Sequence, residues 1–273
     1  MNALTEYTYE SSPEIVFNDF TDPDNYYKLL FLLLDTEVRN IEDPKMDEGI
    51  EDFDSILGKG LIKGRVAIIA EDIATLNEMI ANLKEAFNPR LTQENGDSDE
   101  GYLPFSWPEN IGGTTHNLMV QAKPVEIPKF IKDEKGSGAI VDFLLKIKEP
   151  KKVSQSTKTI TLNAASLTGT NDNDGDMPIY PVVTITGPTN ASPKVLYVET
   201  GEYMEINDTL SGGQSYVIDF KKATILKGGV NAYGNKTSGS KFFDLNSGTI
   251  TLIATNLGAS GVAAVVYRDA FTL

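Results

Sequence analysis

A run of short β-strand patterns begins at Pro181-Val-Val-Thr-Ile-Thr-Gly187-Pro188 and continues to the end of the chain. Each pattern is rich in β-branched or aromatic residues, and Gly, Asn, Pro and Ser clusters separate one from the next. The predicted strands are 182–186, 194–198, 203–206, 215–220, 241–245, 249–254 and 262–267. Short strands at this regular spacing predict an antiparallel β-sandwich over residues 178–273, and that segment contains no candidate active site.

The preceding 177 residues are also β-rich but contain one helical pattern. Ile73, Leu76, Ile80, Leu83 and Phe87 recur at spacings of three and four, which places them on one face of a helix. The run Thr75-Leu-Asn-Glu78 suggests a capping box near its start, and Asn88-Pro89 predicts its end. Strands are predicted at 26–38, 65–70, 102–106, 117–122, 139–147 and 158–162.

The N-terminal 60 residues are harder to interpret. Ile15-Val-Phe17 suggests an edge strand or a docking arm, and the acidic stretch 40–55, with Asp43-Pro44 and Gly49, reads as a loop. Two domains are therefore predicted: a β-rich domain with one helix over 1–163 and the sandwich over 178–273. Residues 164–177 contain Thr168-Gly-Thr-Asn-Asp-Asn-Asp-Gly-Asp176, a composition typical of a linker.

The order of these segments resembles the siphophage distal tail protein family. The matching residues are 181–188, Thr200-Gly-Glu-Tyr-Met-Glu-Ile206, 216–220, Phe242-Phe-Asp-Leu245 with Asn246-Ser-Gly248, and Val265-Val-Tyr-Arg268. Upstream, Gly64-Arg-Val-Ala-Ile-Ile69, Glu85-Ala-Phe-Asn-Pro89 and Ile147-Lys-Glu-Pro150 extend the resemblance to about residue 60. The implied fold class is mainly β, with an α+β ring-forming N-terminal domain and a galectin-like C-terminal sandwich.

The resemblance implies a structural baseplate protein of a long non-contractile phage or prophage tail, with no enzymatic activity. It implies a hexameric ring that joins the tail tube protein to the tail tip, the tail-associated protein and the receptor-binding protein, in a virion assembled in the host cytoplasm. The strands 65–70 and 139–147 are expected to present sheet edges that a neighbouring subunit covers. The alternative is a carbohydrate-binding β-sandwich protein, either extracellular or carried on a tail.

The amino-acid composition argues against several other classes of function. The 273 residues carry a formal net charge of −15, and residues 1–60 hold fifteen acids against four bases. We see no basic stripe, so nucleic-acid readout is not expected, although an acidic segment could line a DNA conduit or simply stay solvated. The absence of cysteine excludes disulfides and thiolate chemistry. The longest apolar run, Leu29–Leu34, is too short for a membrane span, so membrane insertion is not expected.

Two groups of residues could in principle carry chemistry, an acidic segment and the single histidine. Asp172-Asn-Asp174-Gly-Asp176 alternates side-chain oxygens as a calcium loop does, but its glycine comes too early and a distant bidentate glutamate is missing. No metal or cofactor is therefore predicted. The single histidine, His116, could form a triad only with residues such as Ser106 and Asp97, without a nucleophile elbow or an oxyanion loop. No catalytic residue is predicted.

Tyr102 and Trp107 offer the one candidate interaction site, an aromatic platform for a sugar or a partner protein. The alternative is that they are core or subunit-interface residues. The pairs Gly58-Lys-Gly60, Gly212-Gly213 and Gly228-Gly229 lack the motif of a phosphate loop and are interpreted as turns.

Overall fold

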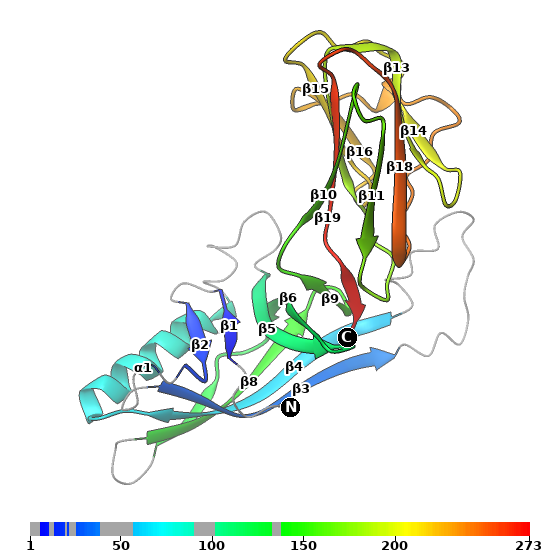
Figure 1. Cartoon of the computed structure of the whole chain (residues 1–273). Coiled ribbons are helices and arrows are strands. Elements are labelled where there is room, and N and C mark those ends of the chain that lie inside the picture. The colour runs from blue at the N-terminus through cyan, green and yellow to red at the C-terminus, as the bar shows by residue number, and fades with distance from the viewer. Residues whose placement is uncertain are drawn as a thin grey trace. The chain divides into compact units, whose positions relative to one another are not determined.

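The computed structural model describes residues 6–10, 14–19, 21, 26–38, 57–89, 102–132 and 138–273. The chain is mainly β, as predicted, and it separates into two compact units (Figure 1). Unit 1 comprises Met1–Gln155 with Leu273, and unit 2 comprises Ser156–Thr272. Within the described residues no helix is long and apolar enough to cross a membrane.

The described residues of unit 1 form one curved sheet with helix α1 beside it. Its strands are ordered β9-β6-β5-β1-β2-β3-β4-β8-β7, and an additional pairing between β6 and β8 brings distant parts of this order together. The elements are β1 (Tyr7–Tyr9), β2 (Ile15–Phe17), β3 (Tyr26–Val38), β4 (Leu57–Ile69), α1 (Ile73–Ala86), β5 (Leu103–Ile111), β6 (Thr114–Pro124), β7 (Lys129–Lys132), β8 (Gly138–Ile147) and β9 (Lys151–Ser154).

The predicted strand 26–38 is confirmed as β3, but two neighbouring predictions are wrong. Ile15–Phe17 is not an edge strand, because β2 lies between β1 and β3. Gly58–Gly60 is not a turn, because it belongs to β4. A Cβ on Gly60 would meet the Ile147 side chain at 3.0 Å, so close packing by a neighbouring strand explains a glycine there. The predicted acidic loop 40–55 lies outside the described residues.

Helix α1 confirms the predicted apolar face except at Ile73, which is 58% exposed. Leu76, Met79, Ile80 and Leu83 are buried against the sheet, and the helix ends at Ala86 before Pro89. The predicted capping box is wrong: the N-cap is Asp72, whose carboxylate accepts a hydrogen bond from the Thr75 backbone N–H at 2.7 Å. The helix closes the core over an aromatic cluster with ring centroids 5.1 to 6.5 Å apart, formed by Tyr9, Phe17, Phe87, Phe105 and Phe143.

Unit 2 is a two-sheet sandwich, as the alternating patterns predict. One sheet has the order β10-β19-β12-β15-β16-β17, and the other has the order β11-β18-β13-β14. The elements are β10 (Lys158–Asn163), β11 (Thr168–Asn173), β12 (Val182–Thr186), β13 (Thr189–Tyr197), β14 (Tyr203–Glu205), β15 (Ser215–Asp219), β16 (Thr224–Lys227), β17 (Val230–Asn231), η2 (Tyr233–Asn235), β18 (Gly248–Leu257), β19 (Val262–Tyr267) and β20 (Ala270–Thr272).

Alternate residues of both sheets fill the core of unit 2. Ile160, Val183 and Val265 are buried on the first sheet, and Val195 and Leu252 on the second. One predicted strand is wrong: residues 241–245 form no strand, although Leu245 makes an isolated bridge with Ile179. The edge of β14 is instead covered just before this segment: the backbone N–H groups of Thr237 and Lys241 donate to the Glu205 and Tyr203 carbonyls at 3.1 and 2.9 Å.

The boundary between the units differs from the predicted linker at 164–177. Residues 158–163 are β10, which pairs with β19 along its length, and residues 168–173 are β11, which pairs with β18. Ladder hydrogen bonds thus hold both segments in the sandwich, and the division of the chain falls at Gln155–Ser156. The small polar residues that suggested a flexible linker instead form an edge strand and a buried turn.

Candidate functional sites

Tyr102 and Trp107 do not form an exposed aromatic platform. Their exposed fractions are 8% and 6%, so both lie in the interior of unit 1. Lys123 covers the Tyr102 ring, with its Nζ 4.5 Å from the ring centroid. The Trp107 indole Nε1–H donates to Glu109 at 3.1 Å, and Glu109 accepts from Lys152 at 2.9 and 3.0 Å. These contacts join β5 to β9, so the structure corrects the predicted platform to a packing role.

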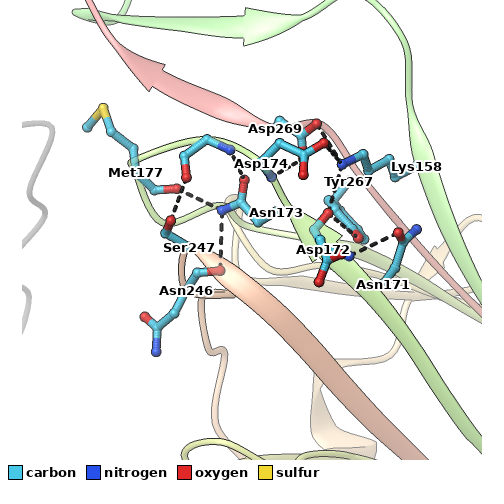
Figure 2. Close-up of polar contacts among 11 residues, drawn as sticks. Lys158, Asn171, Asp172, Asn173, Asp174, Met177, Asn246, Ser247, Tyr267 and Asp269 are labelled. Carbon is cyan, nitrogen blue, oxygen red and sulfur yellow. Dashed lines mark hydrogen bonds and ion pairs between the residues drawn. The ribbon is translucent and has the colours of Figure 1, made fainter. Parts of the chain in front are cut away.

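The acidic segment 172–176 is organised around a lysine (Figure 2). The Lys158 Nζ lies 2.7 Å from an Asp174 carboxylate oxygen and 2.9 Å from one of Asp269, and it also donates to the Asp172 carbonyl at 2.8 Å. The Asp269 carboxylate is almost fully buried, with 5% of its side chain exposed. A buried carboxylate requires a compensating charge, and the ammonium group provides it.

Lys158 occupies the position among these carboxylates that a cation would take in a calcium loop. The Lys158 ammonium lies between the two carboxylates, where a cation would otherwise neutralise them. Burial opposes its charged form, but the hydrogen bonds that Lys158 donates to Asp174 and Asp269 outweigh burial and raise the pKa of Lys158 above its ordinary value. Among the described residues, no group of three or more His, Asp and Glu converges as a metal site.

The turn after β11 is fixed by a second set of hydrogen bonds. The Asn173 side-chain amide donates to the Met177 carbonyl at 2.9 Å and to the Asn246 carbonyl at 3.3 Å, and its oxygen accepts from the Gly175 N–H (Figure 2). A Cβ on Gly175 would lie 1.8 Å from the Ala270 carbonyl oxygen. Only glycine therefore fits at residue 175, because the backbone at 270 passes too close for any side chain.

A second ionic network joins the connections of unit 2. Asp208 accepts hydrogen bonds from Lys227 at 2.7 Å and from the Tyr216 hydroxyl at 2.6 Å, and Asn235 donates to the same hydroxyl. The bonds from Lys227 and Tyr216 lower the pKa of Asp208 to about 2. Burial, together with the bond to Asp208, raises the pKa of Tyr216 to about 12. Sequence reasoning missed this network because its members come from three separate segments.

His116 lies on β6, directly opposite Glu109 of β5. Ser106, the other described member of the hypothetical triad, is buried and stands opposite Met119 at a different level of the same hairpin. Asp97 lies outside the described residues. The hairpin register therefore does not bring Ser106 beside His116 as a hydrogen-bonded nucleophile and base would require.

Strand β3 is paired more fully on one side than on the other. β4 pairs with β3 from Tyr26 to Val38, whereas β2 meets it only at Phe17↔Tyr27. Asn18 extends this contact slightly, because its side-chain oxygen accepts from the Leu29 N–H at 2.8 Å. Beyond that point no strand pairs with the other side of β3 in the described part of the chain. The expected edges at 65–70 and 139–147 are wrong, since β4 and β8 have neighbours on both sides.

Part of this chain matches a known protein family. Residues 174–271 match the family model described as "Siphovirus-type tail component, C-terminal domain". The resemblance to the siphophage distal tail protein family is confirmed. The matched segment begins at residue 174, so it includes Asp174–Met177 of the predicted linker, in agreement with the hydrogen bonds around Asn173.

The fold of the whole chain is similar to that of a solved distal tail protein. The crystal structure of the SPP1 Dit protein, described as a paradigm of the hub adsorption apparatus in phages that infect Gram-positive bacteria, is 11% identical. The match has a TM-score of 0.63 and covers 98% of this chain and 99% of that one. The phage P2 baseplate in its activated conformation with Ca is 8% identical over 96% and 97%, with a TM-score of 0.45. No curated protein matches significantly.

Proposed function

We propose that this protein is a ring-forming structural subunit at the distal end of a siphophage tail, without enzymatic activity. The observation that carries the proposal is the fold similarity to a tail hub protein along both units, together with the siphovirus-type C-terminal domain. Unit 1 forms the ring, most simply a hexamer, and unit 2 is a self-contained domain. The partners are the tail tube protein on one side and the tip and receptor-binding proteins on the other.

The open side of β3 supports an assembly role for unit 1. A strand with unpaired backbone groups along one side is a liability in a monomer, and natural proteins pair it or cover it. A cyclic assembly covers such an edge in every subunit at once. Unit 2 needs no such partner at β14, since residues 237–241 cover that edge with backbone hydrogen bonds to Glu205 and Tyr203.

The proposal is tested by the mass and shape of the purified full-length chain. Light scattering after size-exclusion chromatography is expected to give about six times the chain mass of 29.8 kDa. Negative-stain images are expected to show rings, either alone or after the tail tube protein is added. A chain that stays monomeric at every concentration and does not join the tube protein would refute the assignment to the tail hub.

A further inference from the structure

Tyr233 of η2, in unit 2, is an exposed aromatic side chain that rests on other rings. Among the aromatic side chains that the structure describes, only Tyr233 is exposed, at 48%. Its ring stacks on that of Phe242, with the centroids 6.1 Å apart and the planes inclined by 21°. Phe242 in turn meets Phe220 edge-on at 5.6 Å, and Phe220 is buried. The Tyr233 ring is therefore supported on one face by rings that continue into the core.

Hydrogen bonds also fix the backbone around this ring. The Tyr233 N–H donates to the Asn231 side-chain oxygen at 3.0 Å, and the Tyr233 carbonyl accepts from the Lys236 N–H at 3.0 Å. The Asn207 N–H donates to the Asn235 carbonyl at 2.7 Å, which ties the end of η2 to a separate loop. A side chain that is already fixed loses little conformational freedom when a ligand packs on it, so binding costs less entropy.

Polar groups and open space adjoin the ring. In the described part of the chain, the Tyr233 hydroxyl makes no hydrogen bond and the Asn231 amide nitrogen donates none. A Cβ added to Gly234 would meet nothing within 4 Å, so the space next to Tyr233 is open. An aromatic face, a phenol O–H and an amide NH₂ are thus accessible in one place.

The surroundings of Tyr233 carry no available charge. Residues 228–235 include no charged residue, and the lysines on either side of this segment are bound elsewhere. The Lys227 Nζ lies 2.7 Å from an Asp208 carboxylate oxygen, and the Lys236 Nζ donates to the Ser240 carbonyl at 2.6 Å. Phosphates and carboxylates are bound chiefly through cations, so these contacts favour an uncharged ligand.

We propose that the exposed side of the Tyr233 ring binds a neutral pyranose sugar. The C–H groups on the flat side of a pyranose carry a small positive charge, and the face of an aromatic ring is negative, so the two attract each other. The Asn231 amide and the Tyr233 hydroxyl then hydrogen-bond to sugar hydroxyl groups. This site goes beyond the proposed structural role and does not depend on ring formation.

The size of the apolar surface favours a sugar over a protein partner. Val230 is 71% exposed, but consecutive residues of a strand point to opposite faces, so Val230 does not enlarge the apolar surface on the Asn231 side. The residues that flank Tyr233 in the chain, Ala232 and Gly234, are small. Protein interfaces have a broader apolar centre, whereas one ring beside two polar groups matches one or two sugar units.

Saturation-transfer difference NMR on the full-length chain tests the site with cellotetraose, chitotriose and lactose, three neutral oligosaccharides. At least one of them is expected to bind with a Kd of about 1 mM, with the strongest signals on the pyranose C–H protons. Tyr233→Ala should weaken this binding at least about tenfold, because the stacking surface is lost. Tyr233→Phe keeps the ring and should stay within about threefold of wild type. Val217→Ala, an exposed apolar position of the same unit, is the matched control and should change nothing.

Far-UV circular dichroism and thermal melting confirm that each variant is folded. Absence of transfer to all three sugars, or equal transfer in Tyr233→Ala and wild type, would overturn the inference. If no sugar binds but Tyr233→Ala abolishes co-purification with the receptor-binding protein, the ring anchors a protein and the inference is equally overturned. Light scattering of the same variants should show unchanged assembly, so a failure of the sugar site is distinguishable from a failure of the proposed ring.

Discussion

The two units of this chain differ in how their strand edges and charges are matched within one copy. In unit 2, cations meet carboxylates within the domain: Lys158 binds Asp174 and Asp269, and Lys227 binds Asp208. The edge of β14 is covered as well, by backbone hydrogen bonds from Thr237 and Lys241. In unit 1, by contrast, one side of β3 has no pairing strand beyond Phe17↔Tyr27 among the described residues. The difference indicates that unit 1 has a strand edge suited to being covered by another chain.

Among the substitutions that test this comparison, Gly175→Val is expected to have the largest effect on stability. The added side chain has no room beside the Ala270 carbonyl, so unit 2 should lose about 3 kcal/mol or more of stability. Unit 1 contains the single tryptophan, Trp107, so its fluorescence follows unit 1 alone. In urea, the circular dichroism transition of unit 2 should move to lower concentration while the Trp107 transition keeps its midpoint.

Gly212→Ala is the matched control for that substitution, because a Cβ there meets nothing within 4 Å. It should change neither transition measurably. If the Trp107 transition falls together with that of unit 2 in Gly175→Val, the units do not unfold independently and the comparison between them breaks down.

A smaller but still clear effect is expected from Lys158→Met. The substitution leaves the buried Asp269 carboxylate without its cation, which should destabilise unit 2 by about 3 kcal/mol. Lys222→Met is the control, since the Lys222 side chain is 71% exposed and its nearest carboxylate oxygen, on Asp219, is as far as 4.0 Å away. This substitution should lower the stability of unit 2 by less than about 0.5 kcal/mol. Equal losses in the two variants would mean that the Lys158 network contributes no more than an exposed ion pair.

The smallest effect concerns pH. The pKa of Asp208 is lowered to about 2 in the folded state, so its contribution is complete above the ordinary value of 3.8 and is lost as pH falls toward 2. Partial exposure screens the pair with Lys227, so the expected loss is about 1 kcal/mol. Urea titrations at pH 6 and pH 2.5 should show a smaller difference in Asp208→Asn than in wild type. An identical difference would show that Asp208 is not responsible.

Much of the fold follows from local patterns in the sequence. The strand at 182–186, the strand at 262–267 and the apolar face of α1 match the structure closely because each depends on short-range alternation or helical spacing. Thr168–Asn173 misleads because its polar composition resembles a linker, although its backbone pairs fully with β18. Phe242–Leu245 misleads in the opposite direction, since its alternation suits a strand but its only strand-like pairing is the isolated bridge of Leu245 with Ile179.

The sites were harder to predict than the strands. The ion pair of Arg65 on β4 with Asp142 on β8 joins residues 77 positions apart, and only the strand order brings them together. The Asp172–Asp176 motif was visible, but its partner Lys158 was not, because nothing in the local sequence links the two. The chemical character of Tyr102 and Trp107 was equally visible, and burial alone decides that they pack inward.

The Lys158 network affects how the stability of the sandwich responds to the divalent ions in solution. A bound metal ion is lost when its free concentration falls below its dissociation constant or when a chelator competes for it. The ammonium group of Lys158 is tethered to the chain, so dilution cannot remove it and no chelator can extract it. Calcium and EDTA are therefore expected to leave the melting temperature of unit 2 unchanged. We expect the C-terminal domain to keep its shape in solutions rich or poor in divalent ions.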